Sequence, residues 1–88
     1  MVTEPTPNPN ALKFTLNRTL TEGRSKTYAS PEAAEASPLA KKLFEIAGVK
    51  SVFFLNIFIT VTRQPGTDWA DIARQVEERI RAHYAVGP

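Results

Sequence analysis

The clearest signal in the chain is the pattern of apolar and polar positions, which together with residue type predicts strands in three places. Residues 11–16 are apolar at every second position, the period of a strand with one buried face. Residues 49–55 and 57–63 are rich in β-branched and aromatic side chains, which favour strands. Asn56 separates these two segments and tolerates the positive φ of a tight turn. The two segments are therefore predicted to form a hairpin.

A shorter polar segment predicts the remaining strand. Glu22-Gly23 has the composition of a turn, and residues 25–29 are short enough to return as a strand. We expect this strand to pair with the one at residues 11–16. Before it, residues 1–10 carry three prolines and two asparagines, which disfavour helix and predict an extended N-terminal arm.

Helical spacing appears in two other segments. Ser30-Pro31 and Ser37-Pro38 both have a serine cap followed by proline at the first helical position, and the second is predicted to open the longer helix. An apolar stripe over residues 38–47 predicts this helix, and Gly48 is suited to end it. The same spacing recurs from residue 69 to residue 83 or 84, after Gln64-Pro65-Gly66 stops the last strand.

The predicted order is β-β-α-β-β-α, an α+β fold with a four-stranded, mainly antiparallel sheet and two helices packed on one face. With 88 residues, 42% hydrophobic and 23% charged, the chain is predicted to form one globular domain over residues 1–88. No apolar run approaches the roughly 20 residues that cross a bilayer, and the N-terminus does not read as a signal peptide. A cytoplasmic location and no membrane partner are therefore expected.

The inventory of reactive side chains predicts a protein without catalysis. There is no cysteine, which excludes disulfides, thiolate metal sites and a cysteine nucleophile. His83, the only histidine, falls at a helix end, where a cation is favoured. The carboxylates fall on solvated helix faces, and no nucleophile elbow or phosphate loop is present. We expect no enzyme activity and no resident metal or cofactor.

The hairpin predicts a sheet face that the helices leave open. With a two-residue turn at Leu55-Asn56, Val52 faces Ile59 and Phe54 faces Ile57, and this apolar set packs inside. The opposite set carries four candidate binding residues: Lys13, Phe53, Phe58 and Thr60. As a structural alternative, the two phenylalanines form a cross-strand pair that is partly covered by the arm. Moving the turn by one residue is expected to exchange the faces.

Four segments together resemble a known family, the Nfu/NifU N-terminal domain. They are residues 6–14 (TPNPNALKF), 37–44 (SPLAKKLF), 48–53 (GVKSVF) and 58–63 (FITVTR), and Trp69 also fits. In the full-length family this domain precedes one whose CxxC pair binds an iron-sulfur cluster. The resemblance therefore implies an accessory role in cluster assembly or delivery, and the partner it implies is a cluster carrier or client protein.

The resemblance also directs attention to individual residues. Asn8 and Asn10 belong to its first motif, and either docking or local turn chemistry explains them. Lys13 points to the open face between two inward apolar residues and is the preferred binding residue outside the arm. The family usually has an acid where this chain has Ile57, a departure that lowers the expectation of iron binding and that we interpret as an extension of the apolar face beside Phe54.

Two other functions stay open at this point. An antiparallel sheet with exposed aromatic rings is able to stack single-stranded nucleic acid bases, although a net charge of +2 provides little attraction for phosphates. Weak binding of an iron ion by carboxylates or by His83 is the other. A protein partner is the leading prediction.

Overall fold

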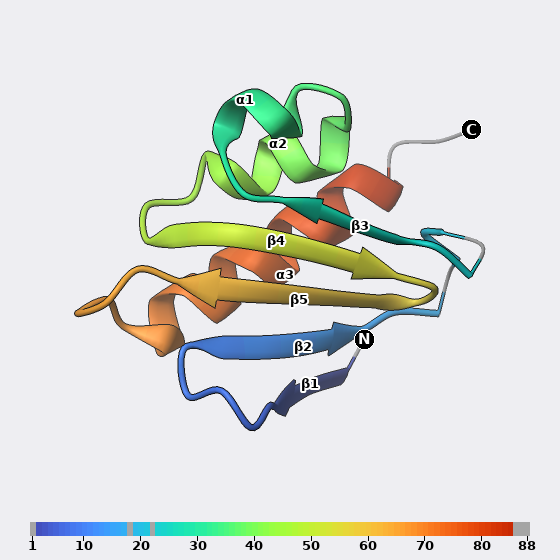
Figure 1. The fold of residues 1–88 in the computed structure, drawn as a ribbon. Coiled ribbons are helices and arrows are strands. Elements are labelled where there is room, and N and C mark those ends of the chain that lie inside the picture. Colours follow the sequence, from blue (N-terminus) through green and yellow to red (C-terminus); the bar gives the residue numbers. More distant parts are fainter. Residues whose placement is uncertain (1, 18, 22, 86–88) are drawn as a thin grey trace.

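The computed structural model describes residues 2–17, 19–21 and 23–85, and Figure 1 shows a single sheet with helices behind it. The elements in chain order are β1 (Val2–Pro5), β2 (Ala11–Thr15), β3 (Ser25–Tyr28), α1 (Pro31–Ala34), α2 (Pro38–Phe44), β4 (Val49–Leu55), β5 (Phe58–Arg63) and α3 (Trp69–Ala85). The α+β class predicted from the sequence is confirmed. No helix in the described ranges is long and apolar enough to cross a membrane.

The sheet has five strands in the order β1-β2-β5-β4-β3, and every neighbouring pair is antiparallel. The prediction of four strands was wrong because the first part of the arm, Val2–Pro5, pairs along β2 from Val2 opposite Thr15 to Pro5 opposite Leu12. A proline is tolerated there because β1 lies at the edge of the sheet, where half of its N–H groups need no strand partner.

The predicted pairing of the second strand was also wrong. β3 pairs with β4, from Ser25 opposite Leu55 to Tyr28 opposite Val52, while β2 is flanked by β1 and β5. The pairing is fixed by a core contact, because Tyr28 is buried and its ring meets Phe54 edge-on at 5.4 Å between centroids. In the predicted turn, Gly23 has a positive φ of 74°, and Glu22 lies outside the described residues.

The hairpin turn is displaced by one residue from its predicted place. Leu55 pairs with Phe58, so the two turn residues are Asn56 and Ile57, and Asn56 has a φ of 52°. The loop between β2 and β3 holds this turn, since the N–H of Gly23 donates to Asn56 Oδ1 at 2.9 Å and the N–H of Asn56 donates to Thr21 Oγ1 at 2.8 Å. Ile57 therefore lies in the turn and does not extend the apolar face beside Phe54.

Helices α2 and α3 cover one face of the sheet and enclose the core (Figure 1). Both serine caps form as predicted, and the side chains of Ser30 and Ser37 accept hydrogen bonds from Ala33 and Ala40. Helix α2 ends at Phe44, three residues earlier than predicted, and a turn leads to Gly48 at a φ of 99°. The core side chains that are fully buried and largest are Phe14, Leu43, Ile59, Val52, Val61 and Val76.

Candidate interaction face

The strand register places four of the predicted site residues on the face that the helices do not cover. Residues opposite one another in an antiparallel pair point to the same face. Lys13 lies opposite Thr60, which in turn lies opposite Phe53, and these three form a row across β2, β5 and β4. The next row consists of Thr15, Phe58 and Leu55. We call these two rows the open face.

Lys13 and Phe58 are in direct contact within the open face. The Nζ of Lys13 lies 4.7 Å from the centroid of the Phe58 ring, and both residues are half-buried. A cation over an aromatic ring at such a site contributes about 0.5 to 1 kcal/mol. Lys13 therefore shields part of the ring.

The two phenylalanines are diagonal neighbours and not a directly opposed pair. Phe53 faces Thr60, and Phe58 faces Leu55. Leu55 is the residue of this face that the sequence analysis missed, because the predicted turn included it. A turn at Asn56-Ile57 was the signal that would have found it, since asparagine suits the first position of a turn with positive φ.

The expectation that moving the turn by one residue exchanges the faces was wrong, because a one-residue move of the turn changes each residue's partner by two positions. Val52 was predicted to face Ile59 and faces Val61 instead, two positions further along the partner strand. Because side chains on a strand alternate with a period of two, both partners point to the same face. Val52, Phe54 and Ile59 are accordingly buried on the helix side.

Asn8 and Asn10 lie apart from the open face, in the connection between β1 and β2. The Oδ1 of Asn8 accepts from the N–H of Asn10 at 2.9 Å, while the Oδ1 of Asn10 accepts from Nε of Arg63 at 3.3 Å. The Thr6 hydroxyl also accepts from the N–H of Asn8 at 3.1 Å. These contacts indicate that both asparagine side chains stabilise the local turn by hydrogen bonding. A docking role for them stays a prediction.

The same connection is attached to the beginning of α3. The indole N–H of Trp69 donates to the carbonyl of Pro9 at 3.1 Å, and the guanidinium of Arg63 lies 5.3 Å from the Trp69 ring centroid. Arg63 also donates to the Thr67 carbonyl at 2.9 Å. Hydrogen bonds and a cation–π contact thus connect the proline-rich motif to the end of β5 and to Trp69 at the start of α3.

The charges of the open face are few. Lys13 lies opposite Glu4 of β1, an exposed acid, so its charge has a nearby counterpart across the strand pair. Within the part of the chain that the structure describes, no three side chains of histidine, cysteine, aspartate or glutamate gather closely enough to hold a metal ion.

Comparison with known proteins identifies the family. Residues 1–87 match the family described as scaffold protein Nfu/NifU N terminal. This chain belongs to the Nfu/NifU N-terminal family. A Homo sapiens relative named NFU1 iron-sulfur cluster scaffold homolog, mitochondrial, is 44% identical over 86 residues, which are 97% of this chain and 34% of that protein. The relative of the same name from Drosophila erecta is 42% identical and is matched over 30% of its length.

Solved structures of two other proteins share the fold of this Nfu/NifU N-terminal chain. The crystal structure of protein SAV1430 from Staphylococcus aureus gives a TM-score of 0.81 at 27% identity, covering 91% of this chain and 95% of that one. A solution structure of a NifU-like protein from Saccharomyces cerevisiae gives 0.77 at 25% identity, covering 98% and 78%. The chain spans about a third of the length of the curated relatives.

Proposed function

We propose that this Nfu/NifU N-terminal chain is a non-catalytic interaction module that serves iron-sulfur cluster assembly or delivery by docking a cluster carrier or client protein. Membership of a family of scaffold proteins supports the role in cluster assembly. The names of the curated relatives describe them as iron-sulfur cluster scaffold homologs. The docking site that we assign is the open face.

One observation carries this proposal. The contact between Lys13 and Phe58 lies beside Phe53 and Thr60 on a sheet face without helical cover. Phenylalanine is enriched at the centre of protein interfaces, and a complementary charge beside it fixes the orientation of the partner. The matching partner surface offers an apolar group to Phe53 and Phe58 and an acidic or carbonyl acceptor to Lys13.

The cluster itself is held elsewhere in this proposal. Iron-sulfur clusters are ligated mainly by cysteine thiolates, and these 88 residues contain no cysteine. The ligands then come from outside this segment of sequence. The contribution of the open face is to bring the cluster-bearing protein into position.

Stacking of nucleic acid bases has less support from the structure. The two rows of the open face contain a single cation, Lys13, and Glu4 lies opposite it. Phosphate contacts supply most of the affinity for nucleic acids, and one partly balanced lysine supplies little of it. As to location, the predicted cytoplasm stays a prediction, and the names of the relatives include the word mitochondrial.

Affinity capture from the source organism tests the proposed function. The tagged chain is expected to recover iron-sulfur proteins, measured by quantitative mass spectrometry and by bound iron. The double variant Lys13→Ala with Phe58→Ala is expected to recover at least about tenfold less of them, since a hot-spot truncation costs about 2 kcal/mol or more and about 1.4 kcal/mol is tenfold in affinity. Arg74→Ala, on the exposed surface of α3, is the matched control and is expected to recover the same amount. Equal recovery by the double variant and the unmodified chain contradicts docking on the open face.

A further inference from the structure

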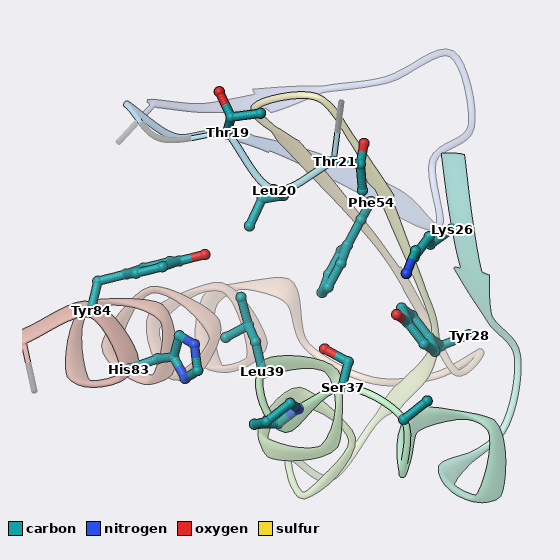
Figure 2. Close-up of a pocket in the computed structure, with 12 residues that line it drawn as sticks. Thr19, Leu20, Thr21, Lys26, Tyr28, Ser37, Leu39, Phe54, His83 and Tyr84 are labelled. Atoms are coloured by element: carbon teal, nitrogen blue, oxygen red, sulfur yellow. The ribbon is translucent and has the colours of Figure 1, made fainter. Parts of the chain in front are cut away.

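A second surface, separate from the open face, is a groove between the helix layer and β3. Its volume is about 290 Å³, and Figure 2 shows the side chains that line it. Leu20 is a half-buried apolar side chain of its lining, and Phe54 and Leu39 of α2 also line it but are almost wholly buried. A neighbouring hollow of about 440 Å³ shares Leu20, Thr21 and Lys26 with the groove and adds Arg24, which comes just before β3. We call the two contiguous hollows the channel.

The side of this channel formed by β3 is cationic. Arg24 and Lys26 both line it and are exposed, and neither has a carboxylate within ion-pair distance among the described residues. No aspartate or glutamate contributes to the described lining of either hollow. In contrast, Arg79 on the helix layer is paired with Glu45. Among the described residues, an acidic ligand thus meets two positive charges that have no paired carboxylate, Lys26 on β3 and Arg24 just before it.

The opposite wall is aromatic and uncharged at neutral pH. His83 and Tyr84 at the end of α3 form it, with their rings edge-on at 4.9 Å between centroids (Figure 2). Burial and, to a smaller extent, the nearby charge of Lys42 lower the pKa of His83, so the imidazole is neutral above its ordinary pKa of 6.5. The carbonyl end of α3 carries partial negative charge. Acidic groups are therefore favoured along β3, and an apolar group is favoured against this wall.

The backbone of β3 offers a further element of recognition. β3 is the last strand of the sheet formed by the described residues, and Ser25, Lys26 and Thr27 are exposed. An edge strand presents N–H and C=O groups that are able to pair with an added strand. Extended peptides bind in this way to exposed sheet edges, with side-chain pockets that supply specificity.

We propose that the channel beside β3 binds an extended, acidic segment of a partner protein, which adds to the free edge of β3, contacts Arg24 and Lys26 with carboxylates and inserts one apolar side chain into the groove. The continuity of the two hollows favours an extended segment over a small anion. Leu20, the half-buried apolar side chain that the two hollows share, distinguishes the ligand from free phosphate or citrate, which have no apolar group to place on it. The docking surface is distinct from the open face, so one protein is able to occupy each.

A panel of short peptides tests this proposal on the intact chain. The probes are capped hexapeptides with two acidic residues at each end and two central positions drawn from Val, Leu, Phe and Tyr. We expect at least one to bind with a dissociation constant below about 1 mM. The expected signature in 15N-labelled protein is a shift of the amide signals of β3 and α3, with slower hydrogen exchange at the β3 amides that do not pair with β4. A matching peptide with lysine in place of each acid is expected not to bind.

Protein and peptide variants separate the two parts of the channel. Lys26→Glu is expected to weaken the best peptide at least about tenfold, because like charges then face one another. Lys50→Glu, an exposed lysine at the opposite end of β4, is the matched control and is expected to leave the affinity unchanged. Changing the central apolar pair of the peptide to serine is expected to weaken binding by a similar factor.

Three results overturn the proposal. The first is that no acidic peptide of the panel shifts the signals of β3. The second is that citrate or inorganic phosphate competes as well as the best peptide, which makes the channel a small-anion site. The third is binding without slower exchange at the edge of β3, which excludes strand addition.

Discussion

Replacing Phe14 by alanine is expected to lower the free energy of unfolding by about 3 to 5 kcal/mol, whereas Phe58→Ala lowers it by about 1 kcal/mol. The two phenylalanines lie on neighbouring strands, opposite Ile59 and Thr15 respectively. Phe14 is fully buried under the helices, and its truncation leaves a cavity in the core. Phe58 is half-buried on the open face and loses chiefly its cross-strand and Lys13 contacts. Urea unfolding followed by circular dichroism measures both values.

The comparison remains informative even if the alanine variant at position 14 fails to fold. A chain of this size has about 4 to 13 kcal/mol of stability in total, so the loss is a large part of it. Phe14→Leu keeps most of the volume and is expected to cost about 1.5 kcal/mol or less. If both alanine variants lose a similarly large part of the free energy of unfolding, both rings lie in a closed core. That result contradicts the assignment of Phe58 to the open face.

Gly48→Ala is expected to destabilise the chain by about 3 kcal/mol, through two effects that act together. Gly48 has a φ of 99°, where a side chain strains the backbone. An added Cβ also lies 2.9 Å from Cδ1 of Ile72 and 3.1 Å from Cγ2 of Thr67. Ile72 is buried in the core and has little room to move aside. The expected shift in the melting temperature is about 12 °C or more, from 4 to 8 °C per kcal/mol.

Gly66→Ala is the matched control for this effect. Gly66 has a similar φ of 83°, but an added Cβ meets no heavy atom within 4 Å. Its cost is the backbone strain alone, about 1 to 2 kcal/mol. The difference between the two variants measures the steric contact with Ile72 and Thr67. Equal losses in thermal unfolding contradict the close packing of Gly48 against α3.

Local chemistry made much of the fold predictable. Strand alternation located β2, since apolar side chains at every second position need one buried face, and β-branched and aromatic residues located β4 and β5. Ser37-Pro38 located the start of α2, where the serine accepts from Ala40 as a capping residue does. The end of α2 was predicted three residues too late, because the apolar stripe continues through Ile46 into a turn that is not helical.

Long-range pairing was the part that the sequence did not reveal. The residues of β1 and β3 are polar or exposed, with burial patterns in which only Tyr28 is buried, so neither strand shows an alternating pattern. Their partners are decided by the sheet that is already formed by β2, β5 and β4. A hairpin between neighbouring segments is the simplest expectation for β3, and the contact between Tyr28 and Phe54 overrides it.

The open face was predictable because its residues depend on strand parity and not on the exact turn. Lys13, Phe53, Phe58 and Thr60 stay on one face for any shift of the pairing by two positions. Leu55 was missed for the opposite reason, since its assignment to the turn or the strand depends on the turn itself. The groove beside β3 could not be predicted from the sequence, because only tertiary packing brings Lys26 and His83 to the same groove.

The central claim is that a protein of the iron-sulfur assembly machinery docks on the open face, and mapping the complex by NMR tests it most directly. The 15N-labelled chain is titrated with the purified iron-sulfur protein that affinity capture recovers in the largest amount. We predict that the amide signals of Lys13, Phe53, Phe58 and Thr60 shift and that Lys13→Ala with Phe58→Ala abolishes these shifts. Shifts confined to the helices, or shifts that persist unchanged in the double variant, would contradict the account.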